Sequence, residues 1–115
     1  MDTGNVFLVG MMGAGKSTVG KALARRLGRE FVDCDREIIK RTGVSIATIF
    51  EIEGEAGFRA RESAVLADVA VRHGTVVATG GGAVLVEANR RLMRENGTVV
   101  YLHAALDQLH ERTRR

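Results

Sequence analysis

Four short apolar stretches alternate with amphipathic segments along the chain, and this alternation predicts a parallel α/β fold. The expected strands cover residues 5–9, 30–33, 75–79 and 98–102. An unbroken apolar run such as 5–9 suits a strand whose sheet is covered on both faces. Strands that alternate with helices form βαβ units, which place parallel strands in one sheet through right-handed crossovers.

The intervening segments have helical periodicity, which predicts the side chains that face the sheet. In segment 16–27, Val19, Leu23 and Leu27 recur every four residues and are expected to point inward. The inward positions expected in two later helices are Phe58, Val65, Leu66 and Val69 in the helix from residue 56 or 57 to about 72, and Leu85, Ala88 and Leu92 around helix 87–95.

The remaining helices are shorter or interrupted. Residues 35–41 form one expected helix, and Ser45 is a good N-cap for another over 46–52. The glycine-containing stretch 53–57 is expected to interrupt that helix before the long one begins. A last helix is expected from residue 105 to the end of the chain.

Composition is that of one globular domain, 1–115, with 45% hydrophobic and 27% charged residues. One cysteine excludes an internal disulfide framework, and the N-terminal region lacks signal-peptide or membrane-span character, so a cytoplasmic protein is expected. The net charge of +3 comes from cations mixed with acids, and only five aromatic side chains are available for base stacking. We therefore expect anionic small molecules as ligands, and neither nucleic acid nor membrane as a partner. The basic C-terminal residues fall within an apparent helix, which suggests that the domain is incomplete at this end.

The sequence G-M-M-G-A-G-K-S at residues 10–17 has the spacing of a phosphate-binding loop. It follows an expected strand and precedes an expected helix, as this motif requires. The glycines let backbone amides turn toward a phosphate, and the helix directs its positive end there. Lys16 is expected to reach the β- and γ-phosphates, and the Ser17 hydroxyl to bind Mg²⁺. A glycine-rich turn with an exposed lysine is the less favoured alternative.

Two further candidate sites follow the second and third strands, at the sheet edge where parallel sheets bind ligands. Asp33 and Asp35 form a D-x-D pair; one carboxylate can hold Mg²⁺, and the other can take a proton from an attacking alcohol. The alternative for Asp35 is a plain helix N-cap. The glycines at 80–82 suit close approach of backbone amides to a small polar ligand, or form a sharp turn without one.

Arg59 and Arg61 lie early in the long helix. A guanidinium there can hold a substrate carboxylate, with Glu62 orienting it. The alternative is ordinary ion pairing, because Glu55 and Glu62 stand four residues before and three residues after Arg59. Phe58 is expected in the core.

Together these motifs resemble the shikimate kinase family. The matching stretches are G-M-M-G-A-G-K-S-T at 10–18, F-V-D-C-D at 31–35, R-T-G-x-S-I-x-x-I-F at 41–50, F-R-x-R-E at 58–62, G-G-G-A-V at 80–84 and T-V-V-Y-L at 98–102. The resemblance implies a three-layer αβα fold of the P-loop NTPase type, of the nucleoside monophosphate kinase kind. It implies strand order 2-3-1-4, with a fifth strand missing from this chain. It also implies transfer of the γ-phosphoryl group of ATP to the 3-hydroxyl of shikimate with Mg²⁺, giving shikimate 3-phosphate and ADP in chorismate and aromatic amino-acid biosynthesis.

The resemblance assigns a role to each candidate residue. Lys16 and Asp35 are the catalytic residues, with Asp35 binding the shikimate hydroxyls and acting as the base. Ser17 ligates Mg²⁺, and Asp33 holds the metal through water. Arg59 binds the shikimate carboxylate. The nucleotide-binding set is Gly13, Ala14, Gly15, Lys16, Ser17, Thr18 and, against the adenine, Arg112. The remaining substrate-binding set is Gly80, Gly81 and Gly82.

The chain lacks the family's lid arginine, its second arginine for the shikimate carboxylate and its adenine loop. A chain without them is expected to bind nucleotide and turn over little. A monomer is expected. Three alternatives stay open: a gluconate or nucleoside monophosphate kinase, a nucleotide-binding module without catalysis and, more distantly, a nucleic-acid-binding protein.

Overall fold

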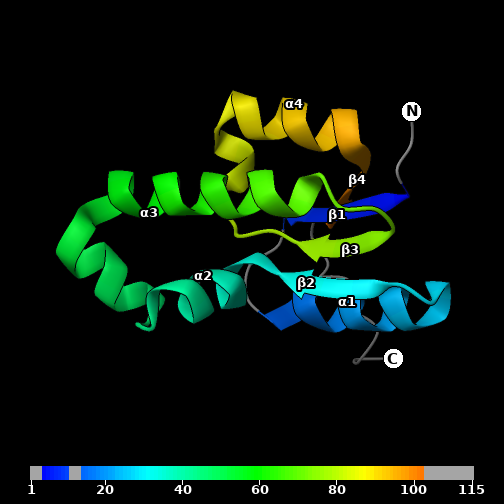
Figure 1. The fold of residues 1–115 in the computed structure, drawn as a ribbon, viewed down its shortest axis with the longest axis horizontal. Coiled ribbons are helices and arrows are strands. Elements are labelled where there is room, and N and C mark those ends of the chain that lie inside the picture. The colour runs from blue at the N-terminus through cyan, green and yellow to red at the C-terminus, as the bar shows by residue number, and fades with distance from the viewer. Residues whose placement is uncertain (1–3, 11–13, 103–115) are drawn as a thin grey trace, which may run out of the picture.

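The computed structural model describes residues 4–10 and 14–102, which form a four-stranded parallel sheet flanked by helices (Figure 1). The elements in chain order are β1 (Asn5–Gly10), α1 (Ala14–Leu27), β2 (Glu30–Asp33), α2 (Cys34–Thr42), α3 (Ile46–Ala70), β3 (Thr75–Ala78), the 3₁₀ turn η1 (Ala83–Leu85), α4 (Glu87–Asn96) and β4 (Gly97–Leu102). The strand order is β2-β3-β1-β4. The expected parallel α/β class and strand order are therefore confirmed.

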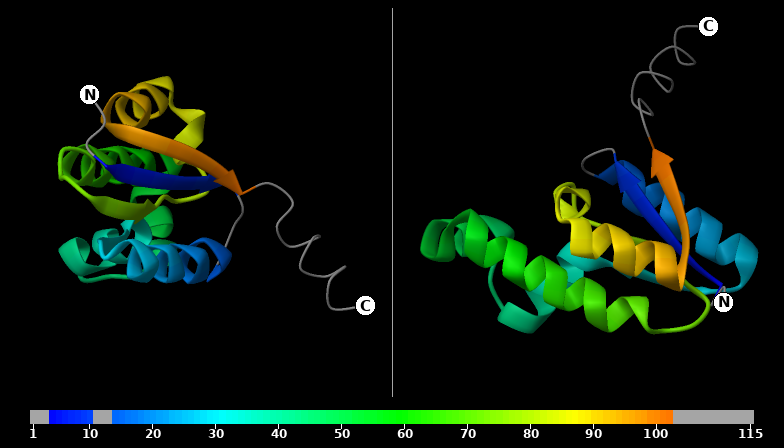
Figure 2. Two further views of the ribbon diagram at one scale, coloured as in Figure 1. Left: turned by 90° about the vertical axis from the view of Figure 1, so that its right-hand side faces the viewer. Right: turned by 90° about the horizontal axis from the view of Figure 1, so that it is seen from above.

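Helices cover both faces of the sheet, as a three-layer αβα fold requires. α1 lies on one face, and α3 and α4 lie on the other (Figure 2). The larger core cluster joins Phe7 and Val9 of β1 to α2, α3 and α4, whereas a smaller cluster joins Leu8 of β1 to α1. Alternate residues of β1 thus serve opposite layers, which explains its unbroken apolar sequence.

The helix α1 lies against the sheet through small residues. Gly20 and Ala24 are buried there, whereas Val19 and Leu27 are 41% and 45% exposed. The expected inward face of Val19 and Leu27 is therefore wrong, and only Leu23 of that set packs against the core. A Cβ on Gly20 would overlap the Phe31 ring, so the close approach of helix and strand depends on this glycine.

The inward face of α4 is also rotated from the expected one. Leu85 is 70% exposed, Ala88 is exposed, and Leu92 is partly buried, while Asn89 and Met93 are buried. The reason is η1: the Asn89 side chain donates to the carbonyl of Ala83 at 3.1 Å and anchors the helix to that turn. This polar contact sets which face of α4 meets the core.

The helix α3 bends at Gly54, whose φ of 74° is not helical. The expected interruption is therefore confirmed within one continuous element. Ser45 caps the helix by accepting from the Thr48 amide at 3.2 Å, also as expected. Phe58, Val65, Leu66 and Val69 are all buried, which confirms the inward face of the second part. The helix expected from residue 105 lies outside the described residues.

The buried side chain of Asn5 holds together the end of the sheet at which the strands begin. Its amide nitrogen donates to the carbonyls of Ala70, Arg72 and Asn96, and its oxygen accepts from the Thr75 amide. It therefore links the ends of α3 and α4 to the start of β3. Because parallel strands all point the same way, this clamp leaves their carboxyl ends free to build the site.

Candidate active site

The start of α1 presents Lys16 and Ser17 at the carboxyl end of β1. Lys16 is only 4% exposed. Burial lowers the pKa of its ammonium group, and the neighbouring carboxylates of Asp35, Asp33 and Glu62 oppose that shift. A buried cation among carboxylates at a helix N-terminus is suited to meet an incoming anion.

Asp33 joins three elements at the end of β2. Its Oδ2 accepts from Ser17 Oγ at 2.6 Å, and its Oδ1 accepts from the amides of Asp35 at 3.0 Å and Arg36 at 3.3 Å. Asp33 is thus the N-cap of α2, so the alternative interpretation of Asp35 as the cap is wrong. Capping holds the Asp33 side chain in place, and the carboxylate of Asp35 is not used to cap the helix.

Asp35 lies in the first turn of α2, and its Oδ1 is buried without a hydrogen-bond partner among the described residues. Burial raises the pKa of this carboxyl, and the charge of Asp33 raises it further, while Lys16 and Arg59 act in the opposite direction. Buried carboxylate oxygens normally accept a hydrogen bond, so an oxygen without a donor is unfavourable. An alcohol hydroxyl placed there would satisfy it and be positioned to give up its proton.

Glu62 supplies a second buried carboxylate from α3. Its side chain is 2% exposed, and Oε1 accepts from Arg59 Nη1 at 3.0 Å. Oε2 has no hydrogen-bond partner in the part of the chain that the structure describes. Burial raises the pKa of Glu62, and its hydrogen bond with Arg59 opposes this. The sequence predicts Glu62 only as a residue that orients Arg59, from its position three residues further along the helix. The burial of Glu62 cannot be predicted in this way, because it depends on tertiary packing.

The loop after β3 passes directly over these carboxylates. A Cβ on Gly80 would overlap Glu62 Oε2 and lie 2.9 Å from Asp35 Oδ1, and a Cβ on Gly82 would overlap the Arg59 guanidinium. These glycines are therefore needed for close approach to side chains of α2 and α3. These contacts are to the protein's own side chains, so both interpretations of the triple glycine, with and without a ligand, stay predictions.

Arg59 and Arg61 have different surroundings. Arg59 is 25% exposed, pairs with Glu55 at 3.4 Å as well as with Glu62, and stacks 5.5 Å from the buried Phe58 ring. Arg61 is 44% exposed and pairs with Glu53 through two hydrogen bonds of 2.8 and 2.7 Å. Ion pairing thus occurs at both, but only Arg59 lies against the loop after β3.

The structure therefore gathers Lys16, Ser17, Asp33, Asp35, Arg59, Gly80 and Gly82 with Glu62 at one edge of the sheet. Ala14, Gly15 and Thr18 belong to the first turn of α1, and Gly81 is exposed within its loop. Gly13 and Arg112 lie outside the described residues.

Burial and the charges of Asp35 and Asp33 raise the pKa of the Cys34 thiol to about 12, so this thiol is not a nucleophile at neutral pH.

The oxygen atoms of Ser17 and Asp33 fit a hard divalent cation. They are 2.6 Å apart, and hydroxyl and carboxylate oxygens are ligands that Mg²⁺ accepts. The described residues contain no group of three or more His, Cys, Asp or Glu side chains that could hold a metal ion. A cation here would need water or phosphate oxygens to complete its shell, which is the usual arrangement for Mg²⁺ at a nucleotide.

The strand order, with the G-x-x-x-x-G-K-S sequence between β1 and α1, identifies a P-loop α/β protein, the class that binds nucleoside triphosphates. The family model for shikimate kinase matches residues 12–115. The chain belongs to the shikimate kinase family.

Individual relatives agree with this assignment. The shikimate kinase of Bordetella avium is 62% identical over 110 residues, which cover 96% of this chain and 53% of that protein. That of Nitrosospira multiformis is 59% identical, over 97% of this chain and 57% of the relative. The chain thus spans about half the length of these relatives.

Solved structures show the same fold. A shikimate kinase from Acinetobacter baumannii in complex with shikimate superposes with a TM-score of 0.83 at 55% identity, covering 85% of this chain and 55% of that one. The shikimate kinase of Aquifex aeolicus gives a TM-score of 0.80 at 44% identity, over 84% of this chain and 58% of that one. None of the helices among the described residues is long and apolar enough to cross a membrane.

Proposed function

We propose that the whole protein transfers the γ-phosphoryl group of ATP to the 3-hydroxyl of shikimate, giving shikimate 3-phosphate and ADP. The observation that carries the proposal is the gathering of Lys16, the Asp35 carboxylate and the Arg59–Glu62 pair at one sheet edge. These groups supply, in turn, a phosphate contact, a proton acceptor and an anchor for a carboxylate. Such a set suits an acceptor that bears both hydroxyl and carboxylate groups.

The phosphate side is formed by the start of α1. The first amides of this helix and the buried Lys16 ammonium would bind the β- and γ-phosphates and stabilise the charge that develops during transfer. Gly13, Ala14, Gly15 and Thr18 would contribute to the same cradle, and Arg112 would lie against the adenine. Ser17 and, through water, Asp33 would hold Mg²⁺. When bound, Mg²⁺ neutralises phosphate charge and aligns the transferring group.

The acceptor side is formed by α2, α3 and the loop after β3. Asp35 Oδ1 would accept the hydrogen bond of the attacking hydroxyl and take its proton as the oxygen attacks phosphorus. Arg59, held by Glu62, would pair with the substrate carboxylate and fix the ring for attack. Gly80, Gly81 and Gly82 would bring backbone against the substrate, since two of them admit no side chain in this packing.

The proposal also covers the partners, oligomeric state and cellular location of the enzyme. ATP and shikimate are its partners in this account, and the protein acts as a cytoplasmic monomer in aromatic amino-acid biosynthesis. Neither nucleic acid nor a membrane takes part. Because the chain spans about half the length of the relatives, the activity is proposed for the whole protein.

The experiment compares Asp35→Asn, Arg59→Ala and the control Arg61→Ala in the whole protein. Phosphorylation of shikimate should fall by about 10²-fold or more in Asp35→Asn, which removes the proton acceptor. Arg59→Ala should chiefly raise the KM for shikimate, and Arg61→Ala should leave turnover unchanged because Arg61 pairs with Glu53 outside the site. Calorimetry should show that all three still bind ATP. Normal shikimate turnover by Arg59→Ala would contradict the substrate assignment.

A further inference from the structure

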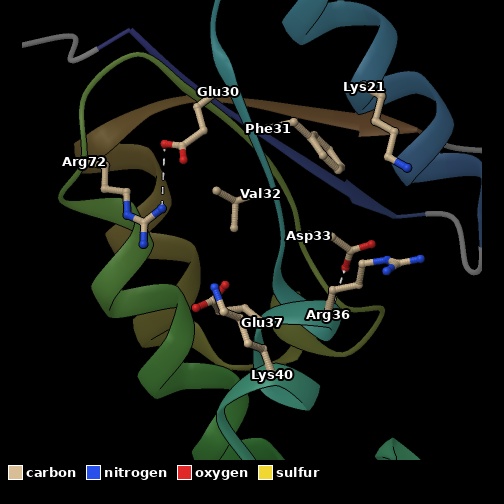
Figure 3. Close-up of a pocket in the computed structure, with 9 residues that line it drawn as sticks. All are labelled: Lys21, Glu30, Phe31, Val32, Asp33, Arg36, Glu37, Lys40 and Arg72. Atoms are coloured by element: carbon tan, nitrogen blue, oxygen red, sulfur yellow. Dashed lines mark hydrogen bonds and ion pairs between the residues drawn. The ribbon is translucent and has the colours of Figure 1, made fainter.

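A groove of about 630 Å³ runs along β2, on the outer edge of the sheet (Figure 3). β2 pairs with β3 on one side only, so its other edge borders this groove. Four lining residues are the strand itself, from Glu30 to Asp33. The others are Lys21 from α1, Arg36, Glu37 and Lys40 from α2, and Arg72 from the turn after α3. Only Asp33 is shared with the candidate active site.

The carboxylates of the groove are already engaged. Asp33 accepts from Ser17 and from the first amides of α2, Glu37 pairs with Arg41 at 3.3 Å, and Glu30 lies 3.8 Å from Arg72. The cations Lys21, Arg36 and Lys40 take part in no ion pair among the described residues. The groove therefore presents three positive charges whose neighbouring negative charges serve other partners.

One of these cations stands where the helix itself gains nothing from it. Arg36 is in the first turn of α2, where a positive charge opposes the helix dipole. Lys40 lies in the last turn of the same helix, four residues after Arg36, where a cation is favourable. An anion beside Arg36 would offset the unfavourable position of that charge. The first turn of α2 is thus better suited to a chain with an anion bound beside Arg36 than to one without.

We propose that this groove is a binding site for a small molecule with two anionic groups, carboxylates or phosphates. Lys21 and Arg36 extend toward the Asp33 end of β2 from different helices and would hold one group (Figure 3). Lys40 follows Arg36 by about 6 Å along the axis of α2 and would hold the second. The volume suits a small molecule. The proposal does not rest on the kinase activity.

The test is an NMR titration of the whole protein, labelled with ¹⁵N, at low salt. Glutarate and tripolyphosphate are the probes, because one carries carboxylates and the other phosphates. At least one should shift the amides of β2 and of Arg36 and Lys40 in a saturable manner. Tripolyphosphate should also shift the amides of Lys16 and Ser17, as a separate process. Which probe binds more tightly identifies the anionic group that the groove prefers.

The triple variant Lys21→Gln, Arg36→Gln, Lys40→Gln should weaken binding in the groove by about tenfold or more. The matched control is Arg25→Gln, Arg26→Gln, Arg94→Gln, which removes the same charge from exposed positions outside the groove. It should change the groove affinity less than about twofold. All six side chains are exposed, so both proteins should fold.

Three results would overturn the proposal. The first is the absence of saturable shifts along β2 with either probe, and the second is an equal loss of affinity in the control variant. The third is saturable binding of an acidic extended peptide when neither small anion binds. That outcome would mean that the open edge of β2 accepts a strand.

Discussion

Gly82→Ala should damage shikimate binding through Arg59 while leaving the fold nearly intact. The new Cβ would overlap the Arg59 guanidinium, which must move away from its place beside the loop. The backbone of Gly82, at φ −94° and ψ −2°, suits alanine, and the displaced atoms are at the end of a flexible side chain. The free energy of unfolding should therefore fall by no more than about 1–2 kcal/mol.

The effect on activity should be larger. A hydrogen bond to a charged group is worth about 1.5–3 kcal/mol, which corresponds to roughly a 10- to 100-fold loss in kcat/KM for shikimate. The KM for ATP should stay unchanged, because the start of α1 is not touched. Steady-state kinetics of the whole protein measures both quantities, and thermal unfolding measures the stability.

A double-mutant cycle with Arg59→Ala separates this explanation from a general disturbance of the loop. If Gly82→Ala acts through Arg59, it should have little further effect once the guanidinium is gone. A full 10- to 100-fold loss in the Arg59→Ala background would refute the reasoning, as would a Gly82→Ala protein with normal shikimate kinetics.

Three further predictions concern stability. Because the folded-state pKa of Asp35 is raised, its ionisation destabilises the fold as the pH rises from about 4 through that raised value. In thermal unfolding scans, Asp35→Asn should therefore be more stable than the parent at pH 7, and the difference should vanish near pH 4. A variant that is less stable than the parent at pH 7 would contradict this. Asn5→Ala should cost about 2–4 kcal/mol in denaturant unfolding, because it leaves buried backbone groups unpaired; a cost below about 1 kcal/mol would show that water replaces the side chain. Gly20→Ala should cost about 1–3 kcal/mol by the same measurement, because its methyl group would overlap the Phe31 ring; an unchanged midpoint would show that α1 can move outward freely.

The strands could be predicted from local sequence and their order from the family resemblance, but two helix faces could not. The apolar stretches are short and separated by clear breaks, so each strand was recognisable. For α1, the choice between Val19 and Gly20 as the buried position depends on how closely the helix approaches Phe31, which is a tertiary property. For α4, the deciding contact is the polar bond from Asn89 to Ala83, which a hydrophobic pattern does not register.

The candidate site was predictable where a motif carries its own chemistry. Lys16, Ser17, Asp33, Asp35 and the glycine loop were identified from residue type and from their positions after strands. The division of labour between the two aspartates was not predictable from the residues alone, because it depends on Asp33 capping α2. The burial of Glu62 could not be predicted from the sequence either, since a glutamate three residues after an arginine on a helix usually stays exposed.

The most direct test of the account is an acceptor comparison with the whole protein, ATP and Mg²⁺, with the products identified by mass spectrometry and NMR. Shikimate, gluconate and AMP are offered separately under identical conditions. The account predicts that shikimate receives a single phosphoryl group on its 3-hydroxyl and that neither gluconate nor AMP is phosphorylated at a comparable rate. Phosphorylation of gluconate or AMP in preference to shikimate, or no shikimate phosphate from a protein that binds ATP, would contradict it.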